Sequence, residues 1–190
     1  MAHDIVAAEE SAFDPGYFVD WKSTGVGNGD PLDRFTCSFG YEDDPQAIAV
    51  DIDATTVYVD RANRAGTLAG FAANCSLIRA DNNAMAPIHL VFAQPVSAAG
   101  AHVSALTWGR GGLGKQYQAI LTARMADSLQ RYTVSVPFRL SNTPGEAPFI
   151  GMQVEGGAAL VSEIWFDVQG ETYGSPAPIQ VVIDELWFHQ

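Results

Sequence analysis

Positive charge is scarce in this 190-residue sequence, which carries 10 Lys and Arg residues against 22 Asp and Glu residues, a formal net charge of −12. A field of this sign repels phosphate backbones and anionic lipid headgroups, which argues against nucleic acid or a membrane surface as a partner. No apolar run approaches the roughly 20 residues that a membrane-spanning helix needs, so membrane insertion is not expected. Calcium, neutral sugars and basic proteins are compatible with the charge.

Cysteine is also scarce. Cys37 and Cys75 are the only two, and they lack the CxxC spacing of a zinc site. They form one disulfide if the protein is exported, or stay as two buried thiols, and the sequence leaves both open. Residues Met1 to Ala12 show no basic segment followed by an apolar one, so no signal peptide is expected there. We expect an extracellular or secreted protein whose leader is absent from this chain, while a cytoplasmic location stays open.

Motifs for metal or nucleophilic catalysis are missing as well. No HxH, HExxH or GxSxG pattern is present. Histidines occur at four separated positions: His3, His89, His102 and His189. The segment from Gly109 to Lys115 matches the GxxxxGK of a phosphate-binding loop, and the stretch after it also fits helical spacing. However, Gln116 stands where a Ser or Thr hydroxyl would bind Mg²⁺, and no succession of crossover helices follows. We therefore interpret the segment as a glycine-rich connection between two strands.

The sequence does have many short strands. Its 18 Gly and 10 Pro residues are scattered and supply many turns. Between the turns, β-branched and aromatic runs predict strands at Arg34–Phe39, Ala47–Ile52, Thr56–Val59, Gly70–Ile78, Ile88–Phe92, Ala101–Thr107, Tyr117–Ala123, Tyr132–Phe138, Phe149–Val154, Leu160–Val168 and Ile179–Phe188. Short strands at this spacing indicate an all-β sandwich or barrel.

Two of these strands alternate clearly between apolar and polar residues. From 131 to 138, apolar residues at the even positions alternate with Arg131, Thr133 and Ser135. From 160 to 168, Ile164, Phe166 and Val168 form an apolar face. The opposite face carries Glu163, Trp165 and Asp167. Such alternation is typical of antiparallel strands with one face in a core.

Several segments in the second half carry a family resemblance. Phe92 to Gly100 precedes a strand, and Tyr117 to Ala123 precedes Leu129 and Thr133-Val134. Further on come Phe149-Ile-Gly151, then Ile164-Trp-Phe166, then Ile183-Asp184-Glu-Leu-Trp-Phe188. In this order they resemble the jelly-roll β-sandwich domains of bacterial exported proteins that often precede a PEP-CTERM sorting tail. Those domains are similar in layout to carbohydrate-binding modules. The sequence ends at Gln190 without such a tail.

The resemblance covers about Leu90 to Phe188 and implies a fold class. We expect a jelly-roll β-sandwich of two antiparallel sheets, with residues 117–123 and 131–138 forming a hairpin. Residues 1–190 are expected to form a single domain, on which residues 1–32 pack as an irregular N-terminal segment.

Two groups of residues are candidates for ligand binding. Trp165 between Glu163 and Asp167 can stack on the apolar face of a sugar while the carboxylates accept hydroxyl hydrogens. The alternative is an outward Trp covered by the N-terminal segment. The second group lies on the loop from Trp108 to Tyr117, which also carries Arg110 and Lys115. Aromatic and Arg side chains on a loop are typical of recognition surfaces, although a hairpin whose two aromatic residues pair is the alternative that we favour.

Asp184 is the candidate metal ligand. Modules resembling this one frequently hold a structural Ca²⁺ near their termini, and the Ile-Asp-Glu-Leu segment places Asp184 there. Asp20, Asp30 and Asp33 are N-terminal partner candidates, because Ca²⁺ takes six to eight oxygen ligands. The alternative is that Asp184 caps or bridges backbone amides of the last strand. Asp51 and Asp53 share one strand face and are interpreted as solvated carboxylates.

From the resemblance we expect a non-catalytic module that binds a glycan or another extracellular ligand. Two alternatives stay open: a glycoside hydrolase or polysaccharide lyase on the same scaffold, and a structural protein that self-assembles into a homo-oligomer. The hydrolase would need two carboxylates about 5–10 Å apart in a groove.

Overall fold

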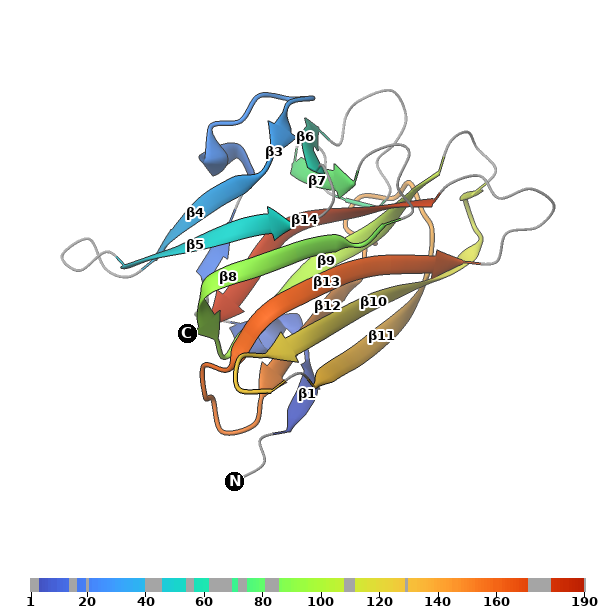
Figure 1. The fold of residues 1–190 in the computed structure, drawn as a ribbon. Helices are drawn as coiled ribbons and strands as arrows, with labels where there is room; N and C mark the ends of the chain where they lie inside the picture. The colour runs from blue at the N-terminus through green and yellow to red at the C-terminus, as the bar shows by residue number, and fades with distance from the viewer. Residues whose placement is uncertain are drawn as a thin grey trace.

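The computed structural model describes residues 4–13, 17–19, 21–39, 46–53, 57–61, 70–71, 75–80, 86–107, 112–128, 130–170 and 179–189. These residues form an eight-stranded and a six-stranded antiparallel sheet, which lie as two layers (Figure 1). No helix in this part of the chain is long and apolar enough to cross a membrane.

The larger sheet has, in spatial order, β1 (Ile5–Ala8), β12 (Phe149–Val154), β9 (Ala98–Thr107), β14 (Ile179–His189), β7 (Ser76–Ala80), β6 (Val57–Arg61) and β3 (Pro31–Leu32), while β2 (Tyr17–Val19) also pairs with β14. The smaller sheet has β11 (Arg131–Arg139), β10 (Gln116–Met125), β13 (Val161–Gly170), β8 (Ile88–Val96), β5 (Gln46–Asp53) and β4 (Arg34–Phe39). Two 3₁₀ turns, η1 (Glu10–Phe13) and η2 (Trp21–Thr24), lie near the N-terminus.

The strand order is that of a jelly roll. From β7 to β14 the chain alternates between the sheets at every step except the β10–β11 hairpin, and it gives the orders β7-β14-β9-β12 and β8-β13-β10-β11. Two interlocked Greek keys produce this arrangement, so the predicted fold class is confirmed. The predicted hairpin is present as β10 and β11, and the strand at Gln116–Met125 excludes the helix that a phosphate-binding loop would need. The predicted strand at 70–78 is observed as β7, which begins only at Ser76.

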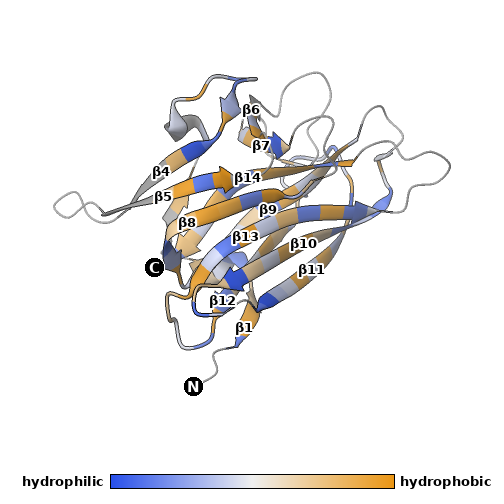
Figure 2. Cartoon of the chain, viewed as in Figure 1, coloured by the Kyte–Doolittle hydropathy of each residue, from blue (hydrophilic) through white to orange (hydrophobic). Residues whose placement is uncertain are grey.

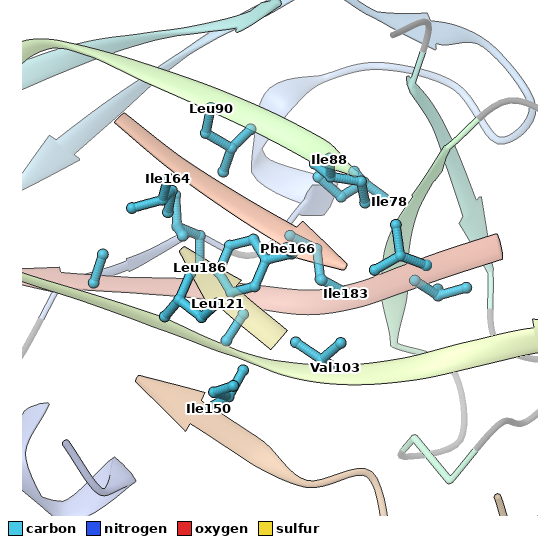
Figure 3. Packing of buried hydrophobic residues seen from close by; sticks show 14 of the residues in the cluster. Ile78, Ile88, Leu90, Val103, Leu121, Ile150, Ile164, Phe166, Ile183 and Leu186 are labelled. Carbon is cyan, nitrogen blue, oxygen red and sulfur yellow. The ribbon is translucent and has the colours of Figure 1, made fainter. Parts of the chain in front are cut away.

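Alternation along the strands places the core between the two sheets. Phe166 and Leu121 of the smaller sheet point toward Ile183 of the larger sheet, and all three are fully buried (Figure 3). Figure 2 shows hydrophilic and hydrophobic residues alternating along β13. Its polar residues therefore lie on the outer face, as the sequence predicts.

The N-terminal segment is more regular than predicted, because it contains β1, β2 and β3 as well as the two turns. These strands are only two to four residues long, too short for an alternation pattern to be visible in the sequence. The segment adds strands to the larger sheet: β1 extends its edge beside β12, and β2 pairs with β14.

Two paired glycines make room for the ring of Phe149 on the larger sheet. Gly100 lies directly opposite Gly151. A Cβ atom at Gly100 would stand 2.6 Å from Phe149 Cζ and 2.9 Å from the Gly151 backbone, so only glycine fits. Phe13 of η1 packs against Phe149 edge to face, with ring centroids 5.5 Å apart, and is fully buried. Aromatic rings over strand glycines restore the packing that the missing side chains would supply.

The sandwich makes a stability prediction. Phe166→Ala removes a fully buried ring between the sheets and should lower the free energy of unfolding by about 3–5 kcal/mol. Gln169→Ala, on the exposed face of the same strand, is the matched control and should change it by less than about 0.5 kcal/mol. Urea unfolding measures both, and equal losses would contradict the assignment of inner and outer faces.

Candidate functional site on the outer face of the smaller sheet

Polar side chains from four adjacent strands meet on the outer face of the six-stranded sheet. The backbone register places Trp165 of β13 opposite His89 of β8 and Thr122 of β10. Two residues earlier on β13, Glu163 lies opposite Arg124. We call the group that surrounds the indole the Trp165 cluster, and it consists of His89, Arg124, Arg131, Glu163 and Trp165.

Trp165 stands between an imidazole and a guanidinium. The His89 ring stacks on the indole, with centroids 4.3 Å apart and planes inclined by 17°. The Arg131 guanidinium carbon lies 4.4 Å from the indole centroid in a cation–π contact. Because β8 and β11 lie on opposite sides of β13, these two groups approach the indole from opposite directions. The described N-terminal strands β1, β2 and β3 belong to the other sheet, so these strands do not cover Trp165.

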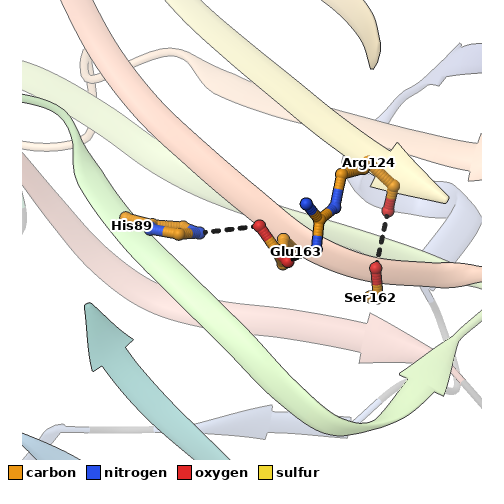
Figure 4. Close-up of polar contacts among 4 residues, drawn as sticks. All are labelled: His89, Arg124, Ser162 and Glu163. Atoms are coloured by element: carbon orange, nitrogen blue, oxygen red, sulfur yellow. Dashed lines mark hydrogen bonds and ion pairs between the residues drawn. The ribbon is translucent and has the colours of Figure 1, made fainter. Parts of the chain in front are cut away.

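Glu163 connects two members of the cluster, His89 and Arg124 (Figure 4). Its side chain is only 11% exposed, and its two oxygens have different partners. Nε2 of His89 donates to Oε2 at 3.1 Å, while the Arg124 guanidinium pairs with Oε1. An ionised carboxylate accepts only, so the shared proton belongs to His89 Nε2. Glu163 therefore fixes the orientation of the imidazole that stacks on Trp165.

The contacts of the cluster also offset the repulsion between two arginine side chains on neighbouring strands. Arg124 and Arg131 lie directly opposite each other on β10 and β11, and like charges in that position destabilise a sheet. Arg124 turns toward Glu163, and Arg131 extends over Trp165. The two guanidinium groups thus have separate partners.

Hydroxyl and amide groups continue the polar face from the cluster along β10 and β11. Oγ1 of Thr122 lies 3.0 Å from Oγ1 of Thr133, and Gln118 donates from Nε2 to Oγ of Ser135 at 3.3 Å. All of these side chains point outward in the strand alternation. They provide donors and acceptors beside an aromatic ring, an arrangement suited to a ligand rich in hydroxyl groups.

Asp167 lies on the same face but apart from the cluster. Its Oδ1 accepts a 2.8 Å hydrogen bond from the Val168 backbone N–H. Burial raises the pKa of the Asp167 carboxyl above its ordinary value, and that hydrogen bond opposes the rise. At the far end of the face, Asp51 forms an exposed 2.9 Å ion pair with Arg34, in agreement with the interpretation of Asp51 as a solvated carboxylate.

The four residues predicted to bind a ligand from the loop between Trp108 and Tyr117 do not form one group in the structure. Trp108 and Arg110 lie outside the described residues, and Lys115 is exposed just before β10. Tyr117 points inward instead: it is 6% exposed, and burial raises the pKa of its phenol. Its ring lies over Gly170, where a Cβ would come within 2.3 Å, and packs beside Phe138. The prediction that Tyr117 offers a face to a ligand is therefore corrected.

The favoured interpretation of that loop also needs correction. A hairpin with paired aromatic residues requires both flanking strands in one sheet. β9 belongs to the larger sheet and β10 to the smaller one, so the loop crosses between layers. The glycine-rich composition does not distinguish these two connections.

Asp184 lies in the middle of β14, opposite Leu77 and His102 and next to a β-bulge at Glu185. The Cys75 thiol donates a hydrogen bond to its carboxylate. Burial raises the pKa of Cys75, and the nearby charge of Asp184 raises it further, so this free cysteine stays protonated. Among the described residues, no group of three or more His, Cys, Asp or Glu side chains is placed to hold a metal. Asp30 and Asp33 thus do not gather with Asp184, and calcium stays a prediction.

Comparison with known proteins gives a distant structural likeness. No family model matches the chain, and no curated protein matches it. A crystal structure of a DUF4465 family protein from Bacteroides caccae aligns with a TM-score of 0.41 and 11% identity, covering 98% of this chain and all of that one. That likeness carries no functional argument, and the sandwich is defined by the strand pairing described above.

Sequence reasoning missed His89, Arg124 and Arg131 as members of the site. His89 is 76 residues before Trp165 in the sequence, and no motif links the two. The only signal was the alternation of β8, β10 and β11, which assigns these residues to an outer face. The alternation does not give the register between strands, and this register determines which side chains lie beside Trp165.

The central role of Glu163 is testable by unfolding. Glu163→Gln keeps the shape of the side chain but removes the charge that Arg124 and His89 contact. We expect a loss of about 1.5–3 kcal/mol in urea unfolding, the range for hydrogen bonds to charged groups. A double-mutant cycle with Arg124→Gln should give a coupling energy above about 0.5 kcal/mol. Simple additivity of the two substitutions would contradict the pairing.

Asp167 predicts a pH dependence of stability. Its folded-state pKa is raised above the ordinary value of 3.8, so its contribution to stability is complete below that pH. The contribution is lost as pH rises through the raised pKa. Asp167→Asn should therefore be more stable than the wild type at pH 7, by less than about 1 kcal/mol because the carboxyl is partly solvated. The difference should vanish below pH 3.8 in thermal melts. A wild type more stable than Asp167→Asn at pH 7 would refute the burial argument.

Proposed function

We propose that this protein is a non-catalytic module that binds a glycan on the outer face of its six-stranded sheet. The observation that carries the proposal is the Trp165 cluster, an aromatic ring held in a fixed orientation among charged groups. An indole beside hydrogen-bonding groups can contact the apolar C–H face of a sugar while its hydroxyls are bound. The resemblance to carbohydrate-binding modules that we expect from the sequence agrees with this proposal and is part of it.

The rigidity of the ring supports binding. The His89 stack and the Glu163 contact hold one side of the indole before any ligand arrives. A preformed surface loses less conformational entropy on association than a mobile one. The neighbouring hydroxyl and amide groups on β10 and β11 extend the surface along the strands, which suits a chain of sugar units.

The geometry favours the binding module over the hydrolase alternative. Glu163 and Asp167 are four residues apart on one strand, a separation of about 13 Å at the rise of a β-strand. The carboxylates of glycosidases are at most about 9.5 Å apart. Glu163 also contacts His89 and Arg124 with its two oxygens, and Asp167 accepts from its own strand.

One observation favours the self-assembly alternative. Phe18 of β2 is 53% exposed on the other sheet, and its ring lies 5.1 Å from that of Trp187. These rings form an aromatic patch remote from the Trp165 cluster, which makes Phe18 a useful control.

Truncation of the indole tests the proposal. Trp165→Ala should weaken binding to any polysaccharide that the wild type binds by about 30-fold or more, the effect of losing an aromatic hot spot. Affinity electrophoresis in gels that contain neutral or acidic polysaccharides ranks the polysaccharides by how strongly they retain the protein. Calorimetry then gives the dissociation constants. Phe18→Ala truncates an exposed aromatic ring on the other sheet and should bind like the wild type.

Two results would contradict the proposal. One is a wild type that is retained by none of the neutral and acidic polysaccharides. The other is equal loss in Trp165→Ala and Phe18→Ala, which would assign binding to a different surface. Circular dichroism and thermal melts of both variants show that any loss is not due to unfolding.

A further inference from the structure

Among the described residues, Arg131 has no carboxylate partner. In the part of the chain that the structure describes, Arg124 pairs with Glu163, whereas the contact of Arg131 is with the indole face. Arg131 is exposed at the start of β11, the edge strand of its sheet. Its charge is therefore available to a ligand.

The two sides of Trp165 differ in how firmly they are covered. His89 belongs to β8 inside the sheet and is held by Glu163. Arg131 reaches the indole from the edge strand and only through a cation–π contact. Such a contact at an exposed site is weaker than a charge-assisted hydrogen bond with a carboxylate. An anionic group nearby would therefore draw the guanidinium away from the ring.

On one side of Trp165, the strands of the β10–β11 hairpin are basic although the whole chain is acidic. Neither β10 nor β11 contains an Asp or Glu residue, and together they carry Arg124, Arg131 and Arg139. Asp127, in the exposed turn between the two strands, is the nearest acidic residue along this hairpin. The net charge of −12 slows the approach of a polyanion, but short-range pairing is decided by the groups at the surface.

From these contacts we propose that the ligand is an acidic glycan built of uronic acid units, and that Arg131 is a displaceable cover of Trp165. The sugar ring takes the place of the guanidinium on the indole, and Arg131 turns to pair with the sugar carboxylate. A uronate has both parts that the site needs, an apolar ring face and a carboxylate beside it. The inference rests on the proposed glycan binding and specifies its ligand class.

The test compares charged and neutral forms of the same polymers. The probes are oligomers of polygalacturonate and of alginate, each with its carboxyl-reduced neutral form, measured by calorimetry at low and high salt. At least one uronate should bind tenfold or more tighter than its reduced form. Arg131→Gln should cost that uronate about tenfold and leave the reduced form as tight or tighter, because the ring is then uncovered.

Arg139→Gln is the matched control. It removes an exposed Arg from the same face of the same strand, about 27 Å from Arg131 at the rise of a β-strand. We expect a change of less than about threefold, since salt screens a charge at that distance. Equal losses of uronate affinity in Arg131→Gln and Arg139→Gln would mean that positive charge anywhere on the strand attracts the ligand. That result would overturn the role of Arg131.

The outcomes also separate this inference from the proposed function. Neutral glycans that bind through Trp165 while no uronate does would refute the ligand class and leave glycan binding intact. A protein that binds neither the uronates nor any neutral polysaccharide refutes both.

Discussion

The two-residue period of β13 is the constraint on which both the core and the site depend. Phe166 and the other inward-facing residues of β13 are buried against the larger sheet. Because side chains alternate along a strand, Trp165 and Glu163 must then lie on the outer face. A slip of one residue would exchange the two sets and place a carboxyl group in the core, at a cost of several kcal/mol, a large part of the stability of a typical domain. The position of the indole on the surface is therefore a consequence of hydrophobic packing beneath it.

The chemistry of the outer face follows from how the neighbouring strands align. The jelly-roll order places β13 between β8 and β10. The imidazole of His89 and the guanidinium of Arg131 therefore reach the same ring from different strands, while the guanidinium of Arg124 reaches Glu163. Glu163 is the link among them, because it neutralises one Arg and orients the histidine. The other arginine, Arg131, contacts the face of the indole. Trp165 is therefore held firmly on the His89 side, whereas its contact on the Arg131 side can be exchanged for a ligand.

Alternation was enough to predict β11 and β13, because that signal is local in the sequence, whereas the β10–β11 hairpin was expected from the family resemblance. Alternation was also enough to place Trp165, Glu163 and Asp167 on one face. Sequence reasoning failed for β1 to β3, which are only two to four residues long. It also failed for Tyr117, which was assigned to a ligand-binding loop although the alternation of β10 turns it to the inner face. His89 could not be assigned to the site at all, because its position beside Trp165 depends on a long-range register that no local pattern encodes.

The most direct measurement is an NMR titration of the isotope-labelled protein with a uronate oligosaccharide, in which backbone amide and indole signals are followed. The account predicts that the shifted signals belong to β8, β10, β11 and β13, with the Trp165 indole among the largest, while β2 and β14 stay unchanged. Shifts centred on Phe18 and Trp187, or no shifts at millimolar ligand, would contradict it.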